Sequence, residues 1–336
     1  MQNKYFVSIV QPKEFTAANK ARDDVDTILE KNGFKKIMFD PIMPRVKKLL
    51  VGSRMWKEAL KNIIAGEIVF QFPFPSRLLL KQFFSSISNK PDLKTIALAH
   101  DIDSLRFFIN DPSRQKEEIE ELNSFDVIIA HNAAMKSYLI SAGVTKPIVE
   151  LELFDYLSSC KILDRSQTVH EICYAGNLQK APFFSEYTGK VPIQIFGPNP
   201  LPKYPPSVHY NGSYPPSELA SKLNGIFGLV WDGNSIQGGG GLYGSYTRYN
   251  NPHKASLFLS LGIPIIVWNN SALSRIVETE SLGVSIKSLD DIDSTISNLS
   301  EDDYFKMKLN AEKMSKKVRH GYFTLKAIRE SEDLLR

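Results

Sequence analysis

Cysteine is scarce in this chain, with only Cys160 and Cys173 among 336 residues. A secreted domain held together by disulfides would carry more cysteines, and two cysteines do not complete a zinc site. The scarcity therefore argues against a disulfide framework and against a cysteine-based metal cluster. It favours the reducing environment of the cytosol.

Long hydrophobic runs are also missing. No stretch approaches the roughly 18 apolar residues that a membrane-spanning helix needs. The first residues, Met1-Gln2-Asn3-Lys4, lead directly into the apolar run at 5–10, without the pattern of a signal peptide. We therefore expect a cytoplasmic protein, which could still touch the inner face of a membrane peripherally.

An excess of one charge is absent as well. The 41 lysine and arginine residues exceed the 37 acidic residues by four. An excess this small does not predict nucleic-acid binding. The remaining composition, 43% hydrophobic and 23% charged, is that of an ordinary globular protein, and the length suggests two domains.

Short apolar runs alternate with longer segments of helical periodicity along the whole chain. The runs predict parallel strands at 5–9, 36–39, 67–72, 95–99, 126–130, 147–151, 171–175, 192–196, 226–231, 264–268 and 283–286. Helices are expected at 19–31, 216–223, 252–261, 272–278, 303–318 and 324–335. This alternation predicts an α/β fold with two Rossmann-like domains facing a central cleft.

A polar break between residues 158 and 167 separates the two halves. We place an N-terminal Rossmann-like domain at 1–158, a C-terminal one at 159–318, and a final helix at 319–336. Ligands of such sheets bind beyond the carboxyl ends of the strands, so the cleft is the expected active site.

The segment Asn250-Asn251-Pro252-His253-Lys254 opens one of the expected helices. Asn251 is a favourable N-cap and Pro252 a favourable first helical residue. A lysine in the first turn is locally unfavourable, because the helix N-terminus already carries partial positive charge. A diphosphate bound by the terminal N–H groups and Lys254 would make the interaction at this helix end favourable. The alternative is an ordinary solvated lysine.

Two further places in the second half suit a phosphate or a nucleoside. Gly176 ends a strand and lets a ligand approach the backbone, so that Asn177 and Lys180 could face a phosphate or sugar. A plain strand-to-helix turn explains the same residues equally well. Tyr214, before two prolines, could stack on a nucleobase or pack on those prolines as a surface residue.

The segment Trp231-Asp232-Gly233 follows another strand, and a glycine-rich stretch comes shortly after it at 237–244. That stretch matches neither the dinucleotide-binding nor the Walker pattern. We interpret it as a mobile loop over the cleft, with a disordered insertion as the alternative. Asp232 is counted among the candidate donor-binding residues.

In the first half, His100-Asp101-Ile102-Asp103 follows a strand. Asp101 is the favoured general base, with His100 beside it. The pair Asp101 and Asp103 could instead bind a divalent cation, or an aspartate could simply cap the next helix. His131 ends the following strand and could line the acceptor side, while Asn132 could cap the next helix.

A basic stretch at 44–61 carries six lysine and arginine residues against the single acid Glu58. Leucine, methionine and tryptophan supply apolar surface in the same stretch. Such a helix is typical of surfaces that lie on anionic lipid, and an ordinary surface helix is the alternative.

Four segments carry a family resemblance: His100-Asp101-Ile102-Asp103, Tyr174-Ala175-Gly176-Asn177-Leu178, Gly228-Leu229-Val230-Trp231-Asp232-Gly233 and Asn250-Asn251-Pro252-His253-Lys254. Together they resemble bacterial glycosyltransferases of the GT-B type. The nearest resemblance is to the β-1,6-galactofuranosyltransferases of polysaccharide gene clusters. The glucosyltransferases that extend sugar on serine-rich adhesins are similar in plan.

The resemblance implies a UDP-sugar donor in the second domain and a glycan acceptor, lipid-linked or protein-linked, in the first. It implies that Lys254 and the turn at 177–180 hold the diphosphate, with Asn251, His253 and Asp232 nearby and Tyr214 beside the nucleoside. It implies no essential metal and no cofactor, and a C-terminal helix that crosses back to the first domain. Relatives of this plan can also self-associate, so a homo-oligomer is possible.

One departure bears on stereochemistry. Many retaining GT-B enzymes carry a pair of glutamates before and at the start of the helix near Lys254. Tyr249 and Leu257 stand at those places here. An inverting transferase of galactofuranose or another hexose is therefore expected. The alternatives are a glucosyltransferase acting on a glycosylated protein, a non-catalytic GT-B-like partner, a metal-dependent transferase of another fold, and an oxidoreductase.

Overall fold

The computed structural model describes residues 3–10, 17–162 and 170–336, and the chain divides into two compact units. Unit 1 comprises Met1–Glu14, Arg22–Leu151 and Thr324–Arg336, and unit 2 comprises Phe15–Ala21 and Glu152–Phe323. The domain limits expected from sequence were 1–158, 159–318 and 319–336. Part of the polar break, 163–169, lies outside the described residues.

Unit 1 contains a six-stranded sheet in the order β2-β1-β3-β4-β5-β6, and every neighbouring pair is parallel. Its strands are β1 (Lys4–Ile9), β2 (Lys35–Phe39), β3 (Gly66–Phe72), β4 (Leu93–Ala99), β5 (Val127–Ala130) and β6 (Ile148–Glu150). β3 and β5 are buried along their whole length, and β5 is therefore a continuous apolar run, whereas β3 also carries the buried polar residues Glu67 and Gln71.

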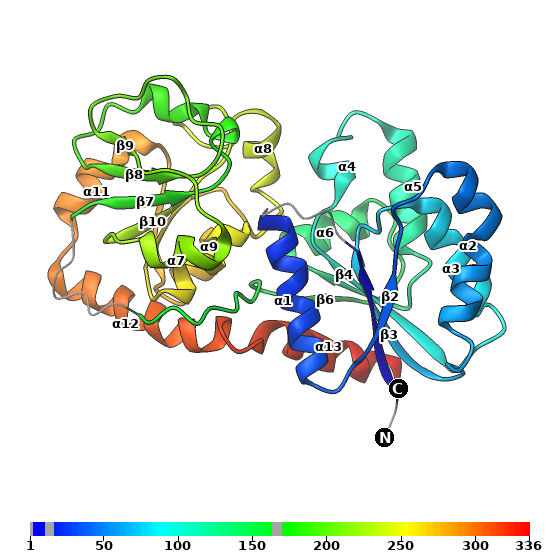
Figure 1. Cartoon of the computed structure of the whole chain (residues 1–336). Helices are drawn as coiled ribbons and strands as arrows, with labels where there is room; N and C mark the ends of the chain where they lie inside the picture. Colours follow the sequence, from blue (N-terminus) through cyan, green and yellow to red (C-terminus); the bar gives the residue numbers. More distant parts are fainter. Residues whose placement is uncertain (1–2, 11–16, 163–169) are drawn as a thin grey trace. The chain divides into compact units, whose positions relative to one another are not determined.

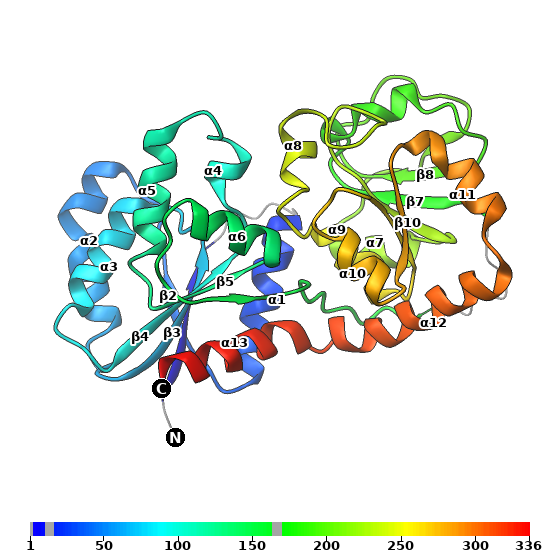
Figure 2. The same cartoon turned by 180° about the vertical axis from the view of Figure 1, so that it is seen from behind.

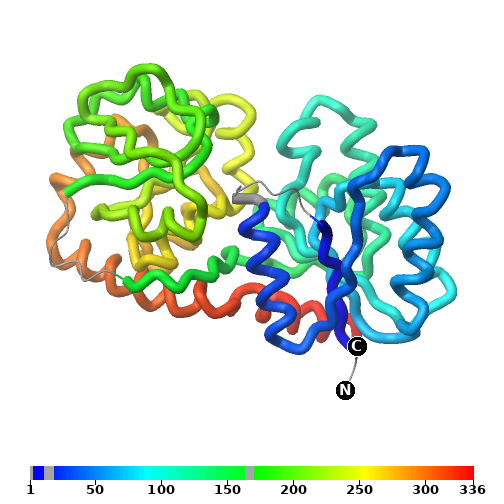
Figure 3. The backbone as a smooth tube through the Cα atoms, viewed as in Figure 1, coloured from blue at the N-terminus to red at the C-terminus, as the bar shows by residue number. Residues whose placement is uncertain are grey.

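Helices cover both faces of this sheet (Figures 1 and 2). They are α1 (Ala17–Lys31), α2 (Arg45–Ala59), α3 (Arg77–Ile87), α4 (Asp103–Arg106), α5 (Pro112–Leu122), α6 (Ala133–Ser141) and α13 (Tyr322–Leu335). The start of the first strand and the end of the last helix come together (Figure 3), where Lys4 forms an ion pair with Glu332.

Unit 2 contains a second six-stranded parallel sheet in the order β12-β11-β10-β7-β8-β9. Its strands are β7 (Ile172–Ala175), β8 (Ile193–Phe196), β9 (Val208–Tyr210), β10 (Phe227–Val230), β11 (Ile265–Trp268) and β12 (Gly283–Ile286). Its helices are α7 (Pro216–Lys222), α8 (Gly241–Tyr246), α9 (His253–Ser260), α10 (Ser274–Thr279), α11 (Ile292–Asn298) and α12 (Glu301–Val318). Short 3-10 turns are η2 (Leu178–Lys180), η3 (Pro182–Glu186) and η4 (Leu289–Asp291).

The predicted class of two Rossmann-like α/β domains is confirmed, and the predicted strands occur within one or two residues of their expected bounds. Helices α3, α4, α5, α6 and α11 had no predicted bounds, and β9 and α8 were not expected at all. β9 has only three residues and lies at the sheet edge with His209 and Tyr210 exposed, so it has no buried apolar run to reveal it. The glycine-rich stretch expected to be a loop contains most of helix α8.

The glycines before α8 are fixed by packing. Gly238 and Gly239 have φ of 72° and 64°, and a methyl group on either would approach the Trp268 ring to 2.3 Å. These positions therefore need glycine both for the backbone conformation and for the close contact.

In each sheet, successive strands are added first on one side of the sheet and then on the other, so each sheet has one topological switch point. In unit 1 this switch lies between β1 and β3, and in unit 2 it lies between β7 and β10. Open α/β sheets bind ligands at such switch points, beyond the carboxyl ends of the strands. Among the described residues no helix is both long enough and apolar enough to cross a membrane.

Candidate functional site

Lys254 lies at the switch point of unit 2. It stands in the first turn of α9, and its Nζ donates to the Tyr174 hydroxyl at 3.2 Å, the Trp231 carbonyl at 2.9 Å and the Asp232 Oδ1 at 2.7 Å. Tyr174 belongs to β7 and Asp232 follows β10. The ammonium therefore joins the two strands between which a ligand is expected.

The electrostatics of this cluster explain how a lysine is tolerated at a helix N-terminus. Burial alone would lower the pKa of Lys254, but the Asp232 carboxylate and Tyr174 raise it above its ordinary value. Burial raises the pKa of Tyr174 to about 12, so the phenol stays protonated. The lysine is a fixed cation, and a diphosphate would meet it already held in place.

The turn after β7 is tied to the turn after β10. The Gly233 N–H donates to the Lys180 carbonyl at 3.2 Å. The Asn177 side chain caps η2 by accepting from the Gln179 N–H, and it also accepts from the Asn199 amide at 3.0 Å. The Lys180 ammonium lies 4.7 Å from the centre of the Tyr243 ring. Asn177 thus caps a short 3-10 turn after β7, and Lys180 lies in the same turn.

The backbone is closely packed where β7 and β8 end. A methyl group on Gly197, whose φ is 144°, would fall 1.8 Å from the Gly176 carbonyl oxygen. Gly176 itself lies against the Tyr174 hydroxyl, with 3.2 Å from a built Cβ to that oxygen. Tyr214 is half-buried, packs at 6.4 Å from the Phe196 ring and receives the Lys222 ammonium at 5.4 Å.

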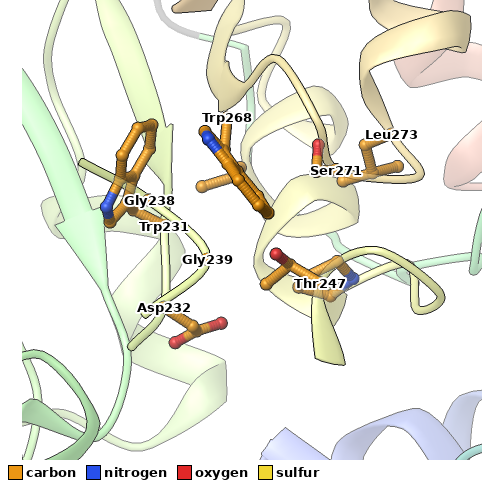
Figure 4. A pocket seen from close by; sticks show the side chains of 10 residues that line it. Trp231, Asp232, Gly238, Gly239, Thr247, Trp268, Ser271 and Leu273 are labelled. Atoms are coloured by element: carbon orange, nitrogen blue, oxygen red, sulfur yellow. The ribbon is translucent and has the colours of Figure 1, made fainter. Parts of the chain in front are cut away.

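A small pocket opens next to Asp232 (Figure 4). Trp268 lies against Gly238 and Gly239 on one side of it, and Asp232 and Thr247 line another part. Its free space of about 10 Å³ is of the order of one water molecule. A nucleotide does not fit in a pocket of this size.

Asn251 and His253 do not have the positions expected of them. The N-cap of α9 is Pro252, without a side-chain cap, because the Asn251 amide donates to the Glu152 carbonyl at 2.6 Å. The His253 ring packs against Phe154 and Tyr156, with centroids 6.0 and 5.1 Å away. Its Nε2 is buried and accepts no hydrogen bond from the described residues. Both side chains contact the segment at 152–156.

His253 makes unit 2 sensitive to acid. Burial and, second, the Lys20 ammonium lower the pKa of His253 to about 4. Between pH 6.5 and 4 the unfolded chain binds a proton that the folded chain does not, so the free energy of unfolding falls as the pH falls. We expect a loss of about 2 kcal/mol between pH 7 and pH 5 from this group.

Urea unfolding of His253→Phe at both pH values tests this expectation, with the exposed His209→Phe as the matched control. The His253 variant should lose less stability on acidification than the wild type, and the control should lose as much as the wild type. An unchanged pH dependence in His253→Phe would contradict the assignment.

In unit 1, His100 belongs to a chain of hydrogen bonds at the ends of β3 and β4. Its Nε2 lies 2.6 Å from the Gln71 Oε1, and the Gln71 Nε2 donates to the Asp26 Oδ1 at 2.6 Å and to the Arg22 carbonyl at 3.2 Å. Because both partners of the Gln71 nitrogen are acceptors, the Gln71 oxygen must face His100. It can only accept, so His100 Nε2 carries a proton and Nδ1 is the basic nitrogen of the neutral ring.

Asp101 and Asp103 have different surroundings. The Asp101 carboxylate forms an ion pair with Arg106. Asp103 begins α4, where Glu118 accepts from the backbone N–H groups of Asp103 and Ser104 at 2.8 Å each. The N-terminus of α4 is thus capped by Glu118, and not by Asp101 or Asp103. Burial raises the pKa of Asp103, with Arg106 opposing it.

His131 and Asn132 have structural positions. His131 is 1% exposed, its Nε2 lies 3.1 Å from the Ala99 carbonyl oxygen, and burial lowers its pKa to about 4. A ring so enclosed has no surface for an acceptor sugar, so the expected acceptor contact is not found at His131. Asn132 caps α6 by accepting from the Met135 N–H, as its capping interpretation required.

Sequence reasoning missed Tyr174, Gln71, Asp26 and Glu118. Gln71 left a signal, because it is a polar residue inside a strand that is otherwise fully buried. The others gave none, since their partners lie far away in sequence. No group of three or more histidine, cysteine or acidic side chains suited to a metal occurs among the described residues.

Comparison with known proteins identifies the class. The chain matches the N-terminal domain model of the glucosyltransferase 3-like family over residues 3–153 and its C-terminal domain model over residues 172–331. The two parallel sheets and these matches define a glycosyltransferase of the GT-B fold. Within that class, the chain belongs to the glucosyltransferase 3-like family.

Curated relatives span nearly the whole chain. The β-1,6-galactofuranosyltransferase WbbI of Escherichia coli K12 is 27% identical over 337 residues, covering 99% of each chain. Glucosyltransferase 3 of Streptococcus gordonii is 25% identical over 317 residues, covering 92% of each chain.

Solved structures share the fold at low sequence identity. Sucrose-phosphate synthase from Thermosynechococcus elongatus has a TM-score of 0.65 at 12% identity, covering 100% of this chain and 99% of the other. An alpha-glucosyltransferase solved in complex with UDP has a TM-score of 0.59 at 13% identity, covering 99% of this chain and 100% of the other.

Proposed function

We propose that this glycosyltransferase moves a hexose, with galactofuranose favoured, from a UDP-sugar to a hydroxyl of a glycan in surface polysaccharide or glycoconjugate synthesis. The observation that carries the donor part is Lys254, which bridges β7 and β10 at the switch point of unit 2. A fixed ammonium at a helix N-terminus is the kind of group that stabilises a leaving diphosphate.

The donor would lie along the ends of the unit 2 strands. The diphosphate would contact Lys254 and the turn at 177–180, and Asp232 would position the ammonium from the other side. Tyr214, which packs beside the end of β8, would flank the nucleoside. A similar fold solved with UDP, and relatives named as galactofuranosyl- and glucosyltransferases, support this choice of donor.

Unit 1 would supply the base for an inverting reaction, since Tyr249 and Leu257 stand where retaining relatives carry glutamates. Between the two candidates we favour His100 over Asp101. The Asp101 carboxylate is paired with Arg106, whereas the chain through Gln71 and Asp26 fixes the tautomer of His100. A histidine oriented in this way is suited to take the proton of an acceptor hydroxyl while the sugar leaves UDP.

The reaction as proposed uses no metal and no cofactor, and its acceptor is a lipid-linked or protein-linked glycan. A glucosyltransferase acting on a glycosylated protein is the second candidate, favoured by the streptococcal relative. A non-catalytic glycan-binding partner of the same fold is the third. Self-association is compatible with each of them.

Thermal unfolding with UDP, UDP-galactofuranose, UDP-glucose and UDP-galactose tests the proposal, with each run repeated in EDTA. Ligand at one hundred times its dissociation constant should add about 2.7 kcal/mol and raise the melting temperature. We expect a shift with UDP that survives EDTA, and the order of the sugars should identify the donor. A shift that needs a divalent cation would overturn the metal-free donor site. No shift with any uridine nucleotide would favour the non-catalytic partner.

A further inference from the structure

The basic stretch at 44–61 forms helix α2, and the transferase chemistry proposed above does not use it. One side of α2 is firmly packed on unit 1. Trp56 is fully buried, stacks on Phe39 at 3.8 Å and donates its indole N–H to the Leu79 carbonyl at 2.7 Å. A methyl group on Gly52 would approach the Gln82 side chain to 2.1 Å, so the helix lies close against α3.

The other side exposes large apolar side chains. Val46 is 66% exposed, Leu49 is 57% exposed and Leu50 is 78% exposed. Val46, Leu50 and Arg54 follow one another at intervals of four residues, so they line one face. An ordinary surface helix would present polar residues on this face. The exposed apolar side chains therefore argue against the alternative that the stretch at 44–61 is an ordinary surface helix.

Cations surround that apolar face. Lys47 and Arg54 lie within about one turn of Leu50, Lys57 lies about one turn further along the helix, and Lys61 follows just after it. Lysine and arginine stems lie along apolar surface while their charged ends reach a polar boundary. The combination fits the boundary of an anionic bilayer, where leucine enters the acyl region and cations meet phosphate groups.

The charge also argues against a second copy of this chain as the occupant. A two-fold contact through the same face would bring its cations, among them Arg54 and Lys57, against an identical set. Like charges would repel across such a contact, whereas every cation on this face would be attracted to an anionic lipid surface. We propose that the exposed face of α2, defined by Val46, Leu49, Leu50, Arg54 and Lys57, docks unit 1 peripherally on anionic lipid.

Vesicle flotation of the full chain tests this proposal, using phosphatidylcholine alone and phosphatidylcholine with about one third phosphatidylglycerol. We expect binding to the anionic vesicles only, weakened by salt. The double variant Arg54→Gln, Lys57→Gln should bind about twentyfold more weakly, since each cation near such a surface contributes roughly fivefold. The double variant Val46→Ser, Leu50→Ser should bind at least tenfold more weakly.

Helix α12 provides a matched control, because Phe305 and Leu309 are also exposed, four residues apart, on a helix with five lysines and four acids. The double variant Phe305→Ser, Leu309→Ser should bind vesicles like the wild type. All variants should keep the UDP-induced thermal shift, which separates this proposal from the proposed function. Equal binding to neutral vesicles, an equal loss in the control, or no vesicle binding would overturn it. Conversion of a dimer to a monomer by Val46→Ser, Leu50→Ser without vesicle binding would assign the face to self-association instead.

Discussion

Replacing Lys254 with alanine is expected to abolish the UDP-induced thermal shift and to lower kcat/KM by about a hundredfold to a thousandfold. Removal of one preorganised group that stabilises developing charge typically has an effect of that size. Here the group is a buried ammonium already held by the Asp232 carboxylate and the Trp231 carbonyl, so it needs no reorganisation when the diphosphate leaves.

The same substitution leaves Asp232 without its partner, so some loss of stability will accompany the loss of binding. Lys254→Met keeps the aliphatic stem and separates the charge from the packing. The exposed Lys306→Ala on α12 serves as the control. Titration calorimetry with UDP should show no binding for both Lys254 variants and normal binding for the control. Binding of UDP by a folded Lys254→Met protein at wild-type affinity would contradict the donor site.

Replacing His100 with alanine is expected to lower kcat by about a hundredfold to ten-thousandfold while leaving UDP binding intact. The effect on kcat follows from the loss of the group that accepts the acceptor proton. UDP binding is kept because the proposed donor residues all belong to unit 2, whereas His100 belongs to unit 1. Steady-state kinetics beside UDP calorimetry separate the two effects.

Asp101→Asn is the informative companion to that variant. If His100 is the base, Asp101→Asn should lower kcat much less, because its carboxylate is engaged with Arg106. The acidic limb of the pH–rate profile should then remain in Asp101→Asn and vanish from the residual activity of His100→Ala. A larger loss in Asp101→Asn, with that limb removed, would return the role of base to Asp101.

Much of this architecture could be predicted from sequence because parallel strands buried on both faces leave continuous apolar runs. Lys254 could be singled out as a candidate, since a lysine two residues after Pro252 at a helix start conflicts with the helix dipole. Asn132 could be predicted as a cap because its role depends only on residues three positions away.

The partners of these residues could not be predicted, because they are contributed by distant segments. Tyr174 is separated from Lys254 by 80 residues, and Asp26 from Gln71 by 45. His253 illustrates a second difficulty. Its place beside Lys254 suggested ligand contact, but successive residues on a helix point in different directions, and His253 faces Phe154 and Tyr156.

Hydrogen–deuterium exchange of the full chain with and without saturating UDP would locate the nucleotide. We expect protection at residues 177–180, at Asp232 and Gly233, and in the first turn of α9, with unit 1 unchanged. Protection confined to unit 1, or none at a UDP concentration that shifts the melting temperature, would contradict a donor site at the β7–β10 switch point.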